Sequence, residues 1–177
     1  MVLLIDHDRE ELIRLFMSEA SNKKQLQNGL AKHQYPQHYI EAIGLVEVCV
    51  AFEAFMNVLD TEEPSIWKKR KLFSEMYQDL FESIYKELKN EITALIEELK
   101  KESLKDMTPK PRTREPIEAA DNPNLEWITQ VIYRVRSNLV HGNKSVNSSR
   151  NKTLISNSFY LLYKIMDAIL RKEKIIT

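Results

Sequence analysis

Residues 73–99 read FSEMYQDLFESIYKELKNEITALIEEL, and this stretch decides the fold class. Its apolar residues recur three or four positions apart, which is the spacing of one face of an α-helix. The pattern predicts one long middle helix over about residues 65–103. Such a helix would be about 55 Å long, more than the width of a compact domain of this size. We therefore expect it either to break near Asn90 or to project from the domain.

Four further segments show helical patterns. The first runs from about Asp8 to Gly29 and has acidic residues in its first turn. The second follows Pro36 and is apolar on most sides over residues 40–56, as expected for the central helix of a bundle. The others span about residues 124–142 and 152–172. With three glycines and no strand pattern, the chain is predicted to be all-α, a single domain over residues 1–177 with about five helices.

A long proline-rich loop is predicted over residues 104–123, directly before the fourth helix. Four prolines are spread through it and exclude a continuous helix. Loops of this length within a domain tend to be functional or mobile. It also contains a basic cluster that either meets phosphates or belongs to a solvated linker, namely Lys110, Arg112 and Arg114.

Composition limits the classes of function. The 26 lysines and arginines balance 26 aspartates and glutamates, so any contact with nucleic acid must be local. The single cysteine, Cys49, excludes an internal disulfide and a two-cysteine metal site. His33 and His38 flank Pro36 and have no acidic cluster nearby, so they form a poor metal site. We predict no metal and no cofactor.

The cellular setting is predicted to be cytoplasmic. The apolar start of the chain, residues 2–5, is too short for the core of a signal peptide. Glu47, Glu53 and Asn57 interrupt the best candidate for a membrane span, which needs roughly 20 apolar residues. We therefore expect a soluble protein with no membrane partner.

Residues 133–142 read YRVRSNLVHG and carry the candidate chemistry. Cleavage of a phosphodiester without a metal needs a group that moves protons near neutral pH and a cation that stabilises charge on the phosphate. Histidine, with a pKa of about 6.5, and arginine, which is always charged, fit these two roles. Both residue types occur here within one short stretch of predicted helix.

This segment resembles the Arg-x4–6-His motif of the HEPN superfamily, and it is most similar to the Apea-like branch. In that family the motif lies on a late helix of a helical bundle and is followed by a polar loop and a closing apolar helix, an order that this sequence shares. The resemblance implies a homodimer that brings two motif copies together and cuts RNA to leave a 2′,3′-cyclic phosphate. It also implies a role as a toxin or in antiviral defence, with an antitoxin or other regulatory protein as a further partner.

The resemblance makes Arg136 the motif arginine and His141 the motif histidine. The family often has a polar residue, commonly asparagine, directly after the arginine, whereas Ser137 holds that place here and Asn138 follows. Helix geometry adds an alternative. Arg134 and His141 lie about 20° apart around a helix, but Arg136 and His141 about 140° apart. Arg134 is therefore the second candidate for the motif arginine.

Non-catalytic alternatives remain at the sequence level. Basic residues near the end of a helix interact favourably with its dipole, and Gly142 suits a helix cap, so capping alone could explain the segment. One alternative is a HEPN-like dimerisation or RNA-binding module, whose apolar second helix and long third helix pair with a partner or another copy. The other is an unrelated helical protein.

Two other groups of side chains have more than one interpretation. Glu53 and Asn57 share a helix face. The sequence leaves four interpretations open for them: a buried polar pair, a dimer contact, part of a site or a partly exposed edge. An aromatic group at helical spacing is either a platform on which nucleic-acid bases stack or, more simply, core: Trp67, Tyr77, Phe81 and Tyr85.

Overall fold

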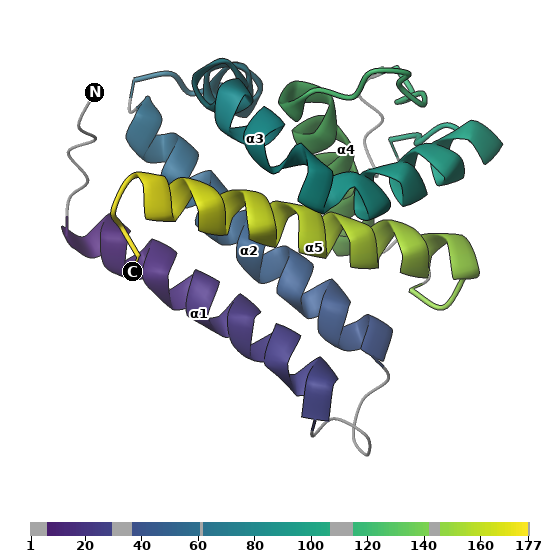
Figure 1. The fold of residues 1–177 in the computed structure, drawn as a ribbon, viewed down its shortest axis with the longest axis horizontal. Helices are drawn as coiled ribbons and strands as arrows, with labels where there is room; N and C mark the ends of the chain where they lie inside the picture. Colours follow the sequence, from purple (N-terminus) through teal and green to yellow (C-terminus); the bar gives the residue numbers. More distant parts are fainter. Residues whose placement is uncertain (1–6, 30–36, 61, 107–114, 142–145, 177) are drawn as a thin grey trace.

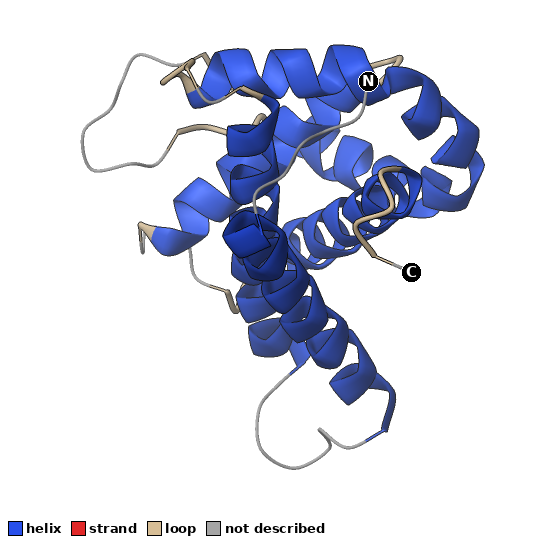
Figure 2. Cartoon of the chain, turned by 90° about the vertical axis from the view of Figure 1, so that its left-hand side faces the viewer, coloured by secondary structure: helices blue, strands red, loops and turns tan. Residues whose placement is uncertain are grey.

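The computed structural model shows five helices in the part of the chain that it describes, which leaves out residues 1–6, 30–36, 61, 107–114, 142–145 and 177. Of residues 7–9 and 23–29 it describes the backbone alone. No strand occurs among the described residues (Figure 2). The all-α prediction is thus confirmed, with the helices α1 (His7–Gly29), α2 (Gln37–Leu59), α3 (Ile66–Lys101), α4 (Leu125–Val140) and α5 (Ser149–Lys172).

Helix α2 lies at the centre of the bundle, as its apolar sequence predicts. It packs against α1 on one side and α5 on the other, and it also contacts α3 and α4. Figure 1 shows α1, α2 and α5 beside one another, with α3 passing over α5. Helix α4 lies against both α3 and α5. One continuous apolar core therefore joins all five helices.

Helix α2 also corrects the prediction that no segment is apolar enough to cross a membrane. It is the one helix in the described part of the chain whose length and composition would allow a span. Half of its most apolar part is buried inside the bundle. Burial against α1 and α5 accounts for this composition, because the central helix of a bundle is apolar on most sides. Its composition is therefore only weak evidence for a membrane span.

Gly44 allows α2 and α5 to approach closely. A Cβ atom at this position would lie 2.7 Å from Cε2 and 2.9 Å from Cζ of the Phe159 ring on α5. Phe159 is fully buried, so its ring has little room to move away. The absence of a side chain at Gly44 is therefore a condition of this packing.

Gly44→Ala is expected to lower the free energy of unfolding by about 1–2 kcal/mol. Overpacking a core costs about 1–3 kcal/mol, and the better helix propensity of alanine offsets up to about 1 kcal/mol of that cost. Urea unfolding would measure the change. Adding Phe159→Leu to Gly44→Ala should recover part of the loss, measured relative to Phe159→Leu alone. An increase in stability for Gly44→Ala would show that the ring does not limit this position.

Helix α3 confirms the long middle helix but contradicts both predictions about its course. It continues without a break through Asn90, and its buried side chains extend from Lys69 to Leu99, so it packs along its length instead of projecting. Figure 1 shows that it curves across the bundle. The Ser83 hydroxyl donates a hydrogen bond to the Leu80 carbonyl at 2.6 Å, a contact that often bends helices.

Candidate active site

Helix α4 presents the candidate residues through an ordinary amphipathic design. Asn124 caps its start, because its side chain accepts a hydrogen bond from the Trp127 backbone N–H at 2.8 Å. The apolar residues of α4 are buried in the core: Leu125, Ile128, Val131, Ile132 and Val135. The C-terminal half of α4 also carries the polar residues of the motif, together with the partly buried Leu139 and the exposed Val140.

Arg134 and Asn138 hold the segment that follows α3. Nη1 of Arg134 donates to the Leu104 carbonyl at 3.4 Å, and Nδ2 of Asn138 donates to the Lys105 carbonyl at 2.9 Å. Both side chains are buried, with exposed fractions of 6% and 1%. Leu104 also forms an antiparallel bridge with Ile117 through two backbone hydrogen bonds of 2.9 and 3.1 Å. These contacts close the base of the predicted proline-rich loop and fix it to α4.

The bridge between Leu104 and Ile117 was not predicted from the sequence. A single bridged pair has no alternating pattern that would reveal it in advance. The basic cluster Lys110, Arg112 and Arg114 lies outside the described residues, as does Gly142.

Arg136 takes part in a charged cluster with Glu53 and Tyr133, which we call the Arg136 cluster. Nη2 of Arg136 lies 3.8 Å from Oε1 of Glu53, and the two side chains are 22% and 29% exposed. The Arg136 guanidinium also lies 5.9 Å from the centre of the Tyr133 ring. Burial raises the pKa of Tyr133, and the negative charge of Glu53 raises it further. The cluster thus joins α4 to the central helix α2.

Glu53 and Asn57, which share a face of α2, contact two different helices. Glu53 faces Arg136, whereas the Asn57 side chain accepts a hydrogen bond from Nζ of Lys69 on α3 at 2.8 Å. Both residues therefore link α2 to a neighbouring helix. Tyr133 belongs to the motif segment but was not predicted as a site residue. Its proximity to Glu53 depends on the packing of α2 against α4, two helices that are far apart in the sequence.

His141 forms the C-terminal cap of α4 and its side chain is exposed. Its backbone N–H donates to the Ser137 carbonyl at 3.1 Å, and Ser137 itself is half-buried. Arg136 is paired with Glu53 on α2, whereas the His141 side chain is exposed. No hydrogen bond joins these two side chains in the described part of the chain. One chain alone therefore does not place the two motif residues together.

Within the described part of the chain, no group of three histidine, cysteine, aspartate or glutamate side chains lies close enough to hold a metal ion. Nε2 of His38 lies 3.1 Å from Oδ1 of Asn147, which gives this histidine a protein partner. His33 lies outside the described residues.

Cys49 is a fully buried thiol near the Arg136 cluster. Burial raises the pKa of Cys49 to about 12, while the positive charge of Arg136 acts in the opposite direction. The thiol therefore stays neutral in the folded protein at pH values where it ionises in the unfolded chain.

Stability is expected to fall as the pH rises above about 9. A group whose pKa is raised by folding contributes its full stabilisation at pH values below its pKa in the unfolded chain. As the pH rises above that value, the free energy of unfolding falls by about 1.4 kcal/mol per pH unit for one group. Cys49→Ala should remove this slope between about pH 9 and 10, before tyrosines ionise in the unfolded chain. Urea unfolding of both proteins at several pH values would measure it. Parallel curves would exclude Cys49 as the source.

Comparisons of this chain with protein-family models, with curated proteins and with solved structures found no significant match. The HEPN resemblance of residues 133–142 therefore stays a prediction.

Proposed function

We propose that this protein is a metal-independent endoribonuclease of the HEPN type that acts as a homodimer. The observation that carries the proposal is the exposed position of His141 at the end of α4, the helix that also bears the partly exposed Arg136. The order of elements also supports it, because α4 precedes the closing apolar helix α5.

The chemistry requires two proton transfers and charge stabilisation. An imidazole removes the proton from a ribose 2′-hydroxyl, and the 2′-oxygen then attacks the adjacent phosphorus. The bond to the 5′-oxygen breaks, and a protonated imidazole returns a proton to this leaving group. The products are a 2′,3′-cyclic phosphate and a 5′-hydroxyl end. A guanidinium stabilises the negative charge on the phosphate oxygens meanwhile.

In the proposal, the homodimer brings together the His141 and Arg136 side chains that a single chain keeps apart. Within a chain Arg136 faces α2 and His141 faces solvent, so a shared cleft needs the α4 end of a second copy. Two copies of His141 would provide both the base and the acid of the reaction. Asn138, Ser137 and Arg134 support the geometry of this end of α4 in the proposal.

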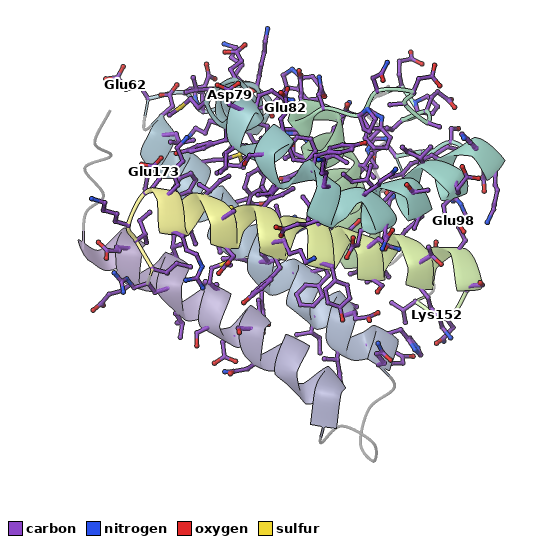
Figure 3. The ribbon with its side chains drawn as sticks, viewed as in Figure 1. Glu62, Asp79, Glu82, Glu98, Lys152 and Glu173 are labelled. Atoms are coloured by element: carbon purple, nitrogen blue, oxygen red, sulfur yellow. The ribbon has the colours of Figure 1, made fainter. Side chains whose placement is uncertain are left out.

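Charge distribution favours a local RNA contact near the start of α5. The exposed acidic residues Asp79 and Glu82 lie on α3 and would repel a phosphate backbone (Figure 3). Lys152 lies in the first turn of α5, the next helix after His141, and Figure 3 places it well away from those acidic residues. Arg150, in the same turn, forms an ion pair with Glu102 at 3.5 Å. RNA would accordingly approach the α4–α5 end of the molecule.

The direct test is cleavage of single-stranded RNA by the purified chain in excess chelator. We expect multiple turnovers and products with 2′,3′-cyclic phosphate and 5′-hydroxyl ends, with a molar mass of two chains by light scattering. Intact RNA after incubation with excess dimer would contradict the nuclease. A role in toxicity or antiviral defence, a regulatory antitoxin and a cytoplasmic setting are part of the same proposal.

A second function is favoured by one observation. Arg134 and Asn138 bond to loop carbonyls, and Arg136 pairs with Glu53, so each has a structural role without any catalysis. This favours a non-catalytic HEPN-like module that dimerises or binds RNA. If the protein is such a module, we expect RNA binding or dimer formation without RNA cleavage under the conditions of the first test.

A further inference from the structure

A cavity of about 330 Å³ lies between α3 and α4. Its size falls in the range of small-molecule sites, which begins at about 300 Å³. Its polar and aromatic lining comes from α3, α4 and the segment before α4: Trp67, Arg70, Glu115, Gln130, Tyr133 and Arg134.

The lining charge favours an anion. Arg70 and Arg134 are 7% and 6% exposed, whereas Glu115 is exposed to solvent. Arginine stays charged when buried, and a buried charge is screened less by water than an exposed one. Two buried arginines and one solvated carboxylate therefore line the cavity and give it a positive character, although Nη1 of Arg134 also donates a hydrogen bond to the Leu104 carbonyl at 3.4 Å. One guanidinium group can donate two parallel hydrogen bonds to two oxygens of a phosphate.

The lining also offers an aromatic surface. The Arg70 guanidinium lies 4.8 Å from the centre of the Trp67 ring and 5.0 Å from that of Tyr133. The prediction that the α3 aromatics form core is confirmed for Tyr77 and Phe81, which are buried, but Trp67 is 47% exposed. An exposed indole beside a positive cavity is suited to stacking on a planar base.

We propose that this cavity binds a nucleotide. Its phosphate lies against Arg70 and Arg134, its base stacks on Trp67, and the amide of Gln130 hydrogen-bonds to the edge of the base. A free nucleoside monophosphate and a nucleotide within single-stranded RNA share this chemistry. The site shares Arg134 with the proposed cleavage site, but it includes neither His141 nor Arg136, so nucleotide binding can be tested separately from RNA cleavage.

The test measures binding of defined probes to the full chain. Trp127→Phe provides a background in which Trp67 is the single tryptophan; Trp127 is outside the cavity lining, and its indole donates to the Glu118 carbonyl at 3.1 Å. The probes are the four ribonucleoside 5′-monophosphates, a short 2′-O-methyl RNA that cannot be cut through its 2′-oxygen, and inorganic phosphate. Binding is followed by Trp67 fluorescence and by calorimetry.

The probes distinguish the sources of the ligand. Binding of monophosphates supports a site for free nucleotides, and binding of the oligonucleotide alone supports a site for RNA. Either result upholds the proposal even if the chain cuts no RNA. Phosphate binding as tight as nucleotide binding would overturn it, and so would no binding of any nucleotide at millimolar concentration.

Two variants test the lining itself. Trp67→Ala removes an exposed ring and is expected to weaken nucleotide binding by about fivefold to a hundredfold, the range measured for loss of one stacked base. Arg70→Lys retains the charge but loses paired hydrogen bonding, and should also weaken binding in calorimetry. Circular dichroism checks that each variant is folded. Unchanged affinity in both folded variants would overturn the proposal.

Discussion

Replacing His141 with alanine is expected to reduce RNA cleavage by about a hundredfold to ten-thousandfold, the usual contribution of a general acid or base. The folded state should be little affected, because the His141 side chain is exposed and, among the described residues, the hydrogen bond of His141 to Ser137 is made by its backbone N–H. The measurement is the initial rate of cleavage of a labelled RNA in excess chelator, alongside urea unfolding of both proteins.

His38→Ala is the matched control. His38 is a partly exposed histidine at the start of α2 whose partner is Asn147, and it lies outside the motif. Its replacement should leave the cleavage rate within about twofold of the wild type, well below the loss expected for a proton-transfer residue. Equal rates for wild type, His141→Ala and His38→Ala would reject His141 as a catalytic residue and favour the non-catalytic module or a contaminating nuclease.

Paired arginine variants decide which arginine serves the reaction. Arg136→Gln should reduce cleavage with a modest loss of stability, because its ion pair with Glu53 is partly solvent-exposed. Arg134→Gln should instead act mainly on stability, because it loosens the Leu104 segment from α4. A folded Arg134→Gln protein with abolished cleavage, beside an active Arg136→Gln protein, would reverse this assignment.

Phe73→Ala is expected to lower the free energy of unfolding by about 3–5 kcal/mol, the cost of removing a phenyl ring from a packed core. Phe73 is fully buried on α3 and lies between two helices. Its ring centre lies 4.8 Å from that of Phe52 on α2 in an edge-to-face arrangement, and 5.2 Å from that of Tyr77. The substitution therefore weakens the contact between α2 and α3 as well as leaving a cavity.

Phe73→Leu is the control for ring loss, because it keeps most of the apolar volume. It should cost clearly less than Phe73→Ala in the same urea titration. Since typical domains have a total stability of about 5–15 kcal/mol, Phe73→Ala could leave a large unfolded fraction. A loss below about 1 kcal/mol for Phe73→Ala would contradict the close packing of α3 on α2.

Features that repeat along the chain could be predicted from the sequence alone. The spacing of apolar residues predicted all five helices, including the long α3, because each residue of a helix face meets the core by the same local geometry. The apolar character of residues 40–56 predicted the central position of α2.

Tertiary structure alone decided the features that depend on residues far apart in the chain. The contacts of Arg136 with Glu53 and of Arg134 with Leu104 join separate elements of the fold. A periodic sequence pattern does not predict an individual contact of this kind. The exposure of Trp67 likewise depends on which helices lie alongside it. Residues 133–140 thus owe their helix to local spacing, whereas the surroundings of Arg136 depend on packing between helices, which is the physical reason the sequence could not predict them.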